Sequence, residues 1–137
     1  MDWITDDIAI GNYLDAQDRD MLKTNGIRSV LCLDRTLQGR APADLGLKSI
    51  EVVPLEDGPG NDPRLFQRAV DTLAGLCKSA GPVRVQCHAG RSRSAVVVAG
   101  HLMRTLGLEA EGALSQVSAK REIAVTAGLK RLLDNLL

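Results

Sequence analysis

Aromatic residues are almost absent from this chain. Trp3, Tyr13 and Phe66 make up 2% of the sequence, so a hydrophobic core must be built from Leu, Val, Ile and Ala. The same scarcity leaves little for nucleic-acid bases to stack on. Seventeen Lys and Arg residues balance seventeen Asp and Glu residues, so the chain has no broad positive field. We therefore expect no nucleic-acid partner, and any anion-binding site must be local.

Long apolar runs are also missing. The longest apolar run, 95–100 within the stretch to residue 102, falls well short of the ~20 residues that span a bilayer, so we expect no membrane partner. Three cysteines, Cys32, Cys77 and Cys87, are too few and too irregularly spaced for a secreted disulfide scaffold, and no signal-peptide pattern opens the sequence. These features lead us to expect a cytoplasmic protein. The length suits one domain, 1–137, expected to be a monomer.

Short apolar runs alternate with longer helical stripes along the chain. The short runs predict strands within 3–10 and at 29–33, 49–53 and 83–86. Helical patterns predict helices at 16–23, 63–79, 92–105, 109–119 and 127–136, with Asp15 and Asp62 as N-caps of the first two. The segments 38–47 and 54–62 are expected to be loops. The alternation predicts an α/β fold: a central, mostly parallel twisted sheet of four to five strands flanked by helices, with 3–10 as an edge hairpin.

The most informative segment is 85–94, Val-Gln-Cys-His-Ala-Gly-Arg-Ser-Arg-Ser. Between a strand and a helix, such a loop can aim successive backbone N–H groups, and the positive end of the helix, at one point. The cup would bind a phosphate dianion, and the same field would favour the thiolate of Cys87. Arg93 would supply a planar fork for two phosphate oxygens, which a lysine cannot reproduce. This spacing, in this context, predicts a phosphate-binding loop.

A cysteine that attacks phosphorus forms a phosphocysteine, and the departing oxygen then needs a proton. The loop at 54–62 contains three carboxylic acids that could supply this proton, namely Glu56, Asp57 and Asp62. Residue spacing alone does not choose among them, and an Asp in Asp-Gly-Pro is often only a turn former.

With these residues in place, the chain resembles the small dual-specificity group of the cysteine-dependent protein phosphatases over nearly its full length. The family signature His-Cys-x5-Arg-Ser/Thr is matched at Cys87, Arg93 and Ser94, and Val53-Pro54-Leu55-Glu56-Asp57 looks like the family's general-acid loop. The resemblance implies hydrolysis of phosphomonoesters, with phosphotyrosine first and phosphoserine or phosphothreonine next, and without metal or cofactor. It also implies the following roles: Cys87 as nucleophile, Arg93 as phosphate clamp, Asp57 as acid and then base, Ser94 as donor to the leaving thiolate, and the backbone of His88, Ala89, Gly90, Arg91, Ser92 and Arg93 as the phosphate cradle.

One position departs from the family pattern. Gln86 stands where the signature has histidine, an imidazole that in the family orders the loop and favours the thiolate. Glutamine can donate a hydrogen bond but carries no charge, so we expect less thiolate and slower turnover. This departure keeps a second hypothesis open, a phosphate-recognition module with little turnover. A phosphatase of a non-protein phosphoester is also open, although the absence of lysine between Cys87 and Arg93 disfavours inositol lipids.

Other reactive side chains admit structural explanations. In some family members a cysteine at the position of Cys32 forms a reversible disulfide with the nucleophile, so Cys32 is a possible redox partner of Cys87; a packed hydrophobe is the alternative. The adjacent Cys87-His88 pair and the distant His101 lack a usual zinc spacing, so no metal is expected. Sulfur-transfer and arsenate-reducing enzymes also use cysteine–arginine anion loops. The order of acid loop before cysteine loop disfavours the arsenate-reducing type, and rhodanese-like sulfur-transfer proteins lack the Asp donor.

Overall fold

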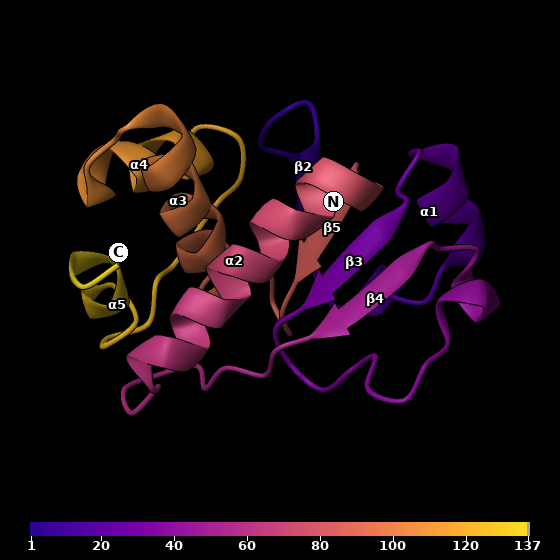
Figure 1. The fold of residues 1–137 in the computed structure, drawn as a ribbon, viewed down its shortest axis with the longest axis horizontal. Helices are drawn as coiled ribbons and strands as arrows, with labels where there is room; N and C mark the ends of the chain where they lie inside the picture. Colours follow the sequence, from indigo (N-terminus) through magenta and orange to yellow (C-terminus); the bar gives the residue numbers. More distant parts are fainter. Residues whose placement is uncertain (137) are drawn as a thin grey trace.

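Five strands form one sheet in the computed structural model, which describes residues 1–136 (Figure 1). They are β1 (Asp2–Trp3), β2 (Ile8–Gly11), β3 (Ser29–Cys32), β4 (Ser49–Val52) and β5 (Val83–Gln86). Their order across the sheet is β1-β2-β5-β3-β4. β1 is antiparallel to β2, and the other three pairs are parallel. The expected α/β fold with a mostly parallel sheet is therefore confirmed.

Helices cover both faces of this sheet. They are α1 (Arg19–Thr24), α2 (Pro63–Ala80), α3 (Arg93–Leu106), α4 (Ala110–Ser118) and α5 (Arg131–Asp134), with 3₁₀ turns at Tyr13–Asp15 and Pro42–Leu45. Strand residues alternate between two hydrophobic clusters: Ile10 and Leu31 pack with α2, α3, α4 and α5, whereas Ala9 and Val30 pack with α1 and the second 3₁₀ turn. This period of two is expected of a sheet that is buried on both faces.

Two helices fix the position of the residues that follow β4 and β5. α2 begins as predicted, because the side chain of Asp62 accepts a hydrogen bond from the N–H of Arg64 at 2.9 Å and Pro63 occupies the first helical position. α3 is buried along 94–102, so it can shift little relative to the sheet. In Figure 1 α2 lies across the front of the sheet and α3 lies to its left, and residues of both helices belong to the hydrophobic cluster on one face of the sheet. Within residues 1–136, no helix combines the length and apolar character that crossing a membrane would need.

Two details of the predicted elements are wrong. Asp15 does not cap the first helix: it ends a 3₁₀ turn and is bound by Arg84, and the helix begins at Arg19, where Asp18 accepts a hydrogen bond from the N–H of Met21 at 3.0 Å. The last predicted helix, 127–136, is helical only in α5. Gly128, with a φ of +94°, has positive-φ backbone that a regular α-helix does not contain, so the helix cannot begin at residue 127 and starts only at Arg131.

Candidate active site

The predicted phosphate loop lies at the carboxyl end of the central strand. Cys87 follows β5 directly, and α3 begins at Arg93, so residues 87–92 turn the chain from strand to helix. The Cys87 side chain is buried, with 2% exposure. No side chain caps the start of α3 at Ser92, so the first N–H groups of this helix are left for another partner.

Four successive carbonyl groups of the loop are held from outside. Tyr13 N–H donates to the oxygen of His88 at 3.0 Å, and Ala124 N–H to that of Arg91 at 3.0 Å. The Arg121 guanidinium donates to the two oxygens between them, Gly90 at 2.6 Å and Ala89 at 3.4 Å. In a planar trans peptide the C=O and the following N–H point in opposite directions, so the N–H groups of residues 89–92 turn toward the centre of the loop. Within residues 1–136 none of these four N–H groups donates a hydrogen bond, which leaves a set of donors suited to an anion.

Gly90 allows this tight turn. Its φ of +67° is in the left-handed region. A Cβ at this position would lie 2.5 Å from the Gly11 oxygen and 2.7 Å from Arg121 Nη2. The loop therefore packs against β2 and Arg121 with no room for a side chain.

Two buried polar atoms in the first turn of α3 have no hydrogen-bond partner within residues 1–136. Arg93 Nη1 donates to the Leu55 oxygen at 3.1 Å, but its buried Nε makes no hydrogen bond within residues 1–136. The hydroxyl of Ser94, completely buried in the first turn of α3, also has no partner among those residues. A buried polar atom that is left unpaired costs about 1–3 kcal/mol. These two atoms and the inward N–H groups are what a bound oxyanion and a thiolate would satisfy.

Of the three candidate acids, Asp57 is tied to the loop. Its Oδ1 accepts a hydrogen bond of 2.7 Å from the Thr126 hydroxyl, and Thr126 N–H donates to the hydroxyl of Ser92 at 2.8 Å. Asp62 instead caps α2 and pairs with Arg64 at 3.2 Å. The backbone N–H and the side chain of Arg64 hold the pKa of Asp62 below its ordinary value, which makes it a poor proton donor. Glu56 is exposed, and no hydrogen bond or ion pair of its side chain occurs within residues 1–136.

The rim of the loop carries two further contacts. The ring of His88 stacks on Tyr13 with 4.1 Å between centroids and 6° between planes. Arg91 pairs with Glu122 at 3.5 Å, and both side chains are mostly exposed. His88 and Arg91 therefore border the mouth of the site.

Cys32 lies beside the strand that carries the nucleophile. It is opposite Gln86 in the register of β3 and β5, and Gln86 Nε2 is 3.7 Å from its sulfur. The thiol donates to Asp34 Oδ1 at 3.1 Å. Burial, with a contribution from the hydrogen bond to Asp34, raises the pKa of Cys32 to about 11. All three cysteines are free, and Cys32 packs in the cluster on the α1 face whereas Cys87 packs in the other.

No group of three His, Cys, Asp or Glu side chains that could hold a metal ion occurs in the part of the chain that the structure describes. His101 lies on α3 and is mostly buried, at 9% exposure. The third cysteine, Cys77, is half-buried on α2.

Sequence reasoning missed four residues that support the loop: Tyr13, Arg84, Arg121 and Thr126. Arg121 and Thr126 lie in 119–126, a segment without any period that sequence patterns could use. Arg84 lies between Val83 and Val85 in β5, and all the residues of this strand are buried. A charged residue between two valines that were expected to be buried was the one sign in the sequence that Arg84 has a special role. It is buried with its neighbours rather than exposed.

Comparisons with known proteins agree with this geometry. The dual specificity phosphatase catalytic domain model matches residues 8–135. Dual specificity protein phosphatase 1 of Arabidopsis thaliana is 31% identical over 93% of this chain and 64% of its own length, and dual specificity protein phosphatase 1-A of Xenopus laevis is 32% identical over 83% of this chain and 30% of its own length. The chain thus spans less than two thirds of the length of either relative.

Solved structures give the same result. A mouse protein described as a dual specificity phosphatase, in complex with zinc tungstate, superposes with a TM-score of 0.83 at 27% identity, covering 97% of this chain and 83% of that one. The human tyrosine phosphatase-like serine/threonine/tyrosine-interacting protein gives a TM-score of 0.83 at 26% identity, covering 98% and 93% of the two chains. By its matched segment, its sheet and its cysteine loop, the chain belongs to the dual specificity phosphatase catalytic domain family.

Proposed function

We propose that the chain hydrolyses phosphomonoesters of proteins through a phosphocysteine intermediate at Cys87. The observation that carries this proposal is the ring of inward N–H groups at residues 89–92, held by four outward carbonyl contacts next to a buried cysteine. Such donors stabilise the charge that develops on the phosphoryl oxygens in the transition state. The unpartnered Nε of Arg93 adds a charged donor at the start of α3.

In the first step the Cys87 thiolate attacks phosphorus, an S–P bond forms and the bond to the leaving oxygen breaks. Asp57, protonated, gives its proton to that oxygen. Its hydrogen bond to Thr126, and through it the link to Ser92, supports Asp57 over Glu56 and Asp62 because it keeps the carboxyl group beside the loop. Asp62, engaged at the cap of α2, is committed elsewhere.

In the second step water attacks phosphorus while the Asp57 carboxylate takes its proton, and the S–P bond breaks to release inorganic phosphate. The departing thiolate is stabilised by a hydrogen bond from the Ser94 hydroxyl. The absence of any other partner for that buried hydroxyl within residues 1–136 supports this role. No metal or cofactor takes part in either step.

We place phosphotyrosine first among the substrates, followed by phosphoserine and phosphothreonine. The Tyr13–His88 stack at the rim offers a flat surface against which a phenyl ring can pack. The proposed setting is a monomer in the cytoplasm, where three free thiols are maintained.

Hydrolysis of para-nitrophenyl phosphate with excess EDTA tests this function. We expect the wild type to release nitrophenol with inhibition by vanadate, and Cys87→Ser to be inactive. Turnover by the serine variant would refute the phosphocysteine mechanism. A wild type that binds vanadate without turnover would instead support a recognition module, the hypothesis that the Gln86 departure keeps open.

A further inference from the structure

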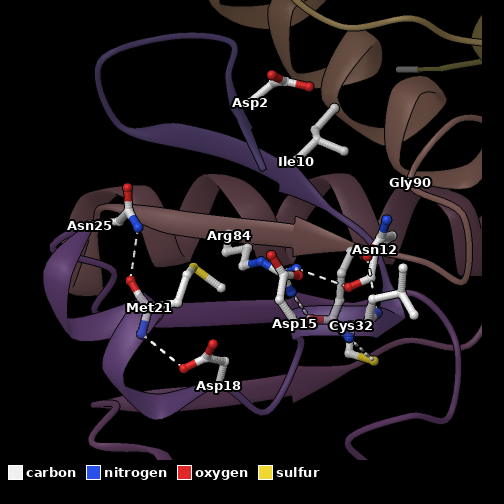
Figure 2. Close-up of polar contacts among 12 residues, drawn as sticks. Asp2, Ile10, Asn12, Asp15, Asp18, Met21, Asn25, Cys32, Arg84 and Gly90 are labelled. Atoms are coloured by element: carbon white, nitrogen blue, oxygen red, sulfur yellow. Dashed lines mark hydrogen bonds and ion pairs between the residues drawn. The ribbon is translucent and has the colours of Figure 1, made fainter.

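A completely buried arginine lies on β5, the strand that ends directly before Cys87. Arg84 is on β5 with 0% exposure. Its guanidinium donates to Gln86 Oε1, to Asp15 and, at 2.9 Å, to the Asn12 oxygen. Since Asn12 and Gln86 both lie at the carboxyl end of the sheet, the side chain runs along the strand toward the loop. Figure 2 shows Arg84 between β5 and the turn that carries Asn12 and Asp15.

The fold makes room for this charge at a cost. A Cβ at Gly11 would overlap the guanidinium where it now lies, so the glycine of the neighbouring strand leaves the space that the guanidinium occupies. The Nε of Arg84 has no partner within residues 1–136, and the side chain of Asp15 is one third exposed. A buried ion pair of this kind generally stabilises a fold no better than apolar residues of the same volume. Stability alone therefore does not account for Arg84.

Arg84 contacts two segments that adjoin the loop: Gln86, which precedes Cys87, and the Asn12–Asp15 turn, which contacts His88. The Asn12–Asp15 turn that it holds includes Tyr13, whose N–H binds the His88 oxygen and whose ring stacks on His88. Gln86, which it also holds, immediately precedes Cys87. With its oxygen on Arg84, the Gln86 amide is oriented so that Nε2 faces the sulfur of Cys32. One guanidinium thus fixes the chain on each side of the nucleophile.

Charge near Cys87 comes from every element around the loop. Asp15 compensates Arg84 only partly, because its carboxylate is in contact with water and is screened. Burial lowers the pKa of Arg84 from its ordinary value, and the Asp15 carboxylate opposes that effect, so the guanidinium stays charged at neutral pH. Other charged or titratable groups also lie around the site. They are Arg121 after α4 with its partner Asp2, Arg93 on α3, His88 and Arg91 in the loop with Glu122 beside Arg91, Asp57 after β4, and Cys32 and Asp34 at the end of β3.

We propose that Arg84 is a positioning residue of this active site: it fixes Gln86 and the Asn12–Asp15 turn at the base of the loop, and its buried charge favours an anion at Cys87. The proposal rests on the proposed function in taking Cys87 as the nucleophile. It also changes what is expected of Gln86. The positive charge that glutamine lacks is supplied two residues earlier, and Gln86 serves as the acceptor that holds it.

The test compares two variants that both break the Arg84–Asp15 pair. Arg84→Met removes the positive charge, and Asp15→Asn removes the negative one. The readout is the rate of Cys87 alkylation by iodoacetamide against pH, followed by mass spectrometry of the Cys87 peptide and restricted to conditions where circular dichroism shows folded protein. We expect the midpoint of the alkylation rate against pH to move up by about one pH unit in Arg84→Met and to move down in Asp15→Asn, since a unit charge roughly 12 Å from a thiol changes its pKa by about one unit at an effective dielectric constant of about 20.

Opposite shifts distinguish an electrostatic role from a structural one, because loss of packing alone would move both variants in the same direction or neither. Unshifted midpoints, or shifts of the same sign, would overturn the proposal. Arg84→Lys covers the case in which Arg84→Met does not fold: it keeps the charge and loses the fork, so the midpoint should stay within about 0.3 of the wild-type value while kcat falls roughly tenfold. A lysine variant with an unchanged kcat would contradict the positioning role.

Arg68→Met, which removes an exposed arginine of α2, is the matched control and should leave the midpoint in place. Alkylation needs no turnover, so the two proposals fail separately. Shifted midpoints in a protein that hydrolyses no phosphoester would refute the proposed function and support the role of Arg84. Hydrolysis by the wild type, together with variants whose alkylation midpoints do not shift, would support the proposed function and refute the role of Arg84.

Discussion

At the scale of single residues, the position of Asp57 depends on one hydroxyl. Thr126 donates to Asp57 Oδ1 at 2.7 Å and is itself joined to Ser92 of the loop by two hydrogen bonds, of 2.8 and 3.0 Å. We expect Thr126→Val to lower kcat by about tenfold to a hundredfold for an alkyl phosphate, whose leaving oxygen needs the proton, and much less for para-nitrophenyl phosphate. Measuring kcat over a series of leaving groups of increasing basicity checks this.

Thr126→Ser is the control for that series, since it keeps the hydroxyl and removes only a methyl group. The kcat of Thr126→Ser should equal that of the wild type for every leaving group. An equal loss for all leaving groups in Thr126→Val would mean that the hydroxyl supports the loop as a whole and does not act through Asp57.

The redox role proposed for Cys32 gives a second residue-scale prediction. Peroxide converts the Cys87 thiolate to a sulfenic acid, and a Cys32 thiolate attacking that sulfur would form the disulfide and release hydroxide. Because the pKa of Cys32 is raised to about 11, its thiolate fraction rises about tenfold per pH unit near neutrality. We expect the Cys32–Cys87 disulfide to form markedly faster at about pH 8.5 than at about pH 6.5, as followed by non-reducing peptide mapping.

Cys32→Ser should give sulfinic and sulfonic Cys87 under the same treatment. If the wild type gives the same overoxidised products and no disulfide at either pH, Cys32 is a packing residue.

Residues that act through local chemistry were the predictable part of the site. Cys87, Arg93 and Ser94, the residues of the proposed mechanism, are recognisable because they fall at a fixed spacing between a strand and a helix. Asp57 was separated from Glu56 and Asp62 only by the resemblance to the family, because all three acids lie in the same turn-rich loop. Arg84 reaches Asn12, Arg121 reaches Gly90 and Thr126 reaches Asp57 through hydrogen bonds that span 72, 31 and 69 positions of sequence. No local pattern encodes such contacts, so they are visible only after the chain is folded.

At the scale of elements, a glycine of the loop and a glycine of α2 can be compared, because an added Cβ has no room at Gly90 and meets nothing at Gly75. Gly90→Ala would place a Cβ 2.5 Å from a backbone oxygen at a positive φ, which displaces the N–H groups of the loop. We expect roughly a hundredfold loss of kcat/KM and weaker vanadate binding, the size seen when an oxyanion donor is lost. Gly75→Ala meets nothing within 4 Å on the exposed face of α2 and should stabilise the protein by about 0.5–1 kcal/mol.

Steady-state kinetics and urea unfolding of both variants check this pair. A Gly90→Ala protein with wild-type kcat/KM would show that the loop tolerates the side chain, contrary to the close approach of β2.

Strands and long helices were predicted well because burial dictates their periods. β3, β4, β5 and α2 differ from the predicted ranges by one residue at most. Both errors arise from tertiary contacts that a local pattern does not encode. Asp15 has the composition of a cap, but the buried guanidinium of Arg84 competes for it, and Asp18 caps α1 instead. Similarly, the left-handed Gly128 brings its turn against Pro59, a tertiary contact that overrides the helical pattern of 127–136.

At the scale of the whole molecule, the sheet separates two hydrophobic clusters, and the site lies at the edge where both meet. Cys87 belongs to the cluster of α2 and α3, whereas Cys32 belongs to that of α1. Arg84 and Gln86 bridge the strands beneath the loop on the α1 side. The geometry of the loop therefore depends on the packing of both faces, and global destabilisation should affect activity before complete unfolding.

Global stability should itself depend on one histidine. Burial lowers the pKa of His101 on α3 below its ordinary value of 6.5, with Asp7 opposing and Arg104 adding to the effect. The folded state thus keeps His101 neutral at a pH where the unfolded chain binds a proton. Stability from this group is complete above about pH 7 and is lost as the pH falls below the unfolded value toward the folded one.

Urea unfolding at about pH 7.5 and about pH 5.5 measures this effect in wild type and His101→Gln. We expect the free energy of unfolding to fall more in the wild type than in the variant between the two pH values, because only the wild type gains the extra proton on unfolding. His88 is present in both proteins and cancels in the comparison. Asp34 and Asp62 also cancel, because both are present in the two proteins. Burial alone would raise the pKa of Asp34, but the Thr36 N–H and the Cys32 thiol hold this pKa below its ordinary value. Arg64 does the same for Asp62, so both carboxyl groups titrate below this pH range. Equal falls in the two proteins would mean that another group couples folding to protons between these pH values.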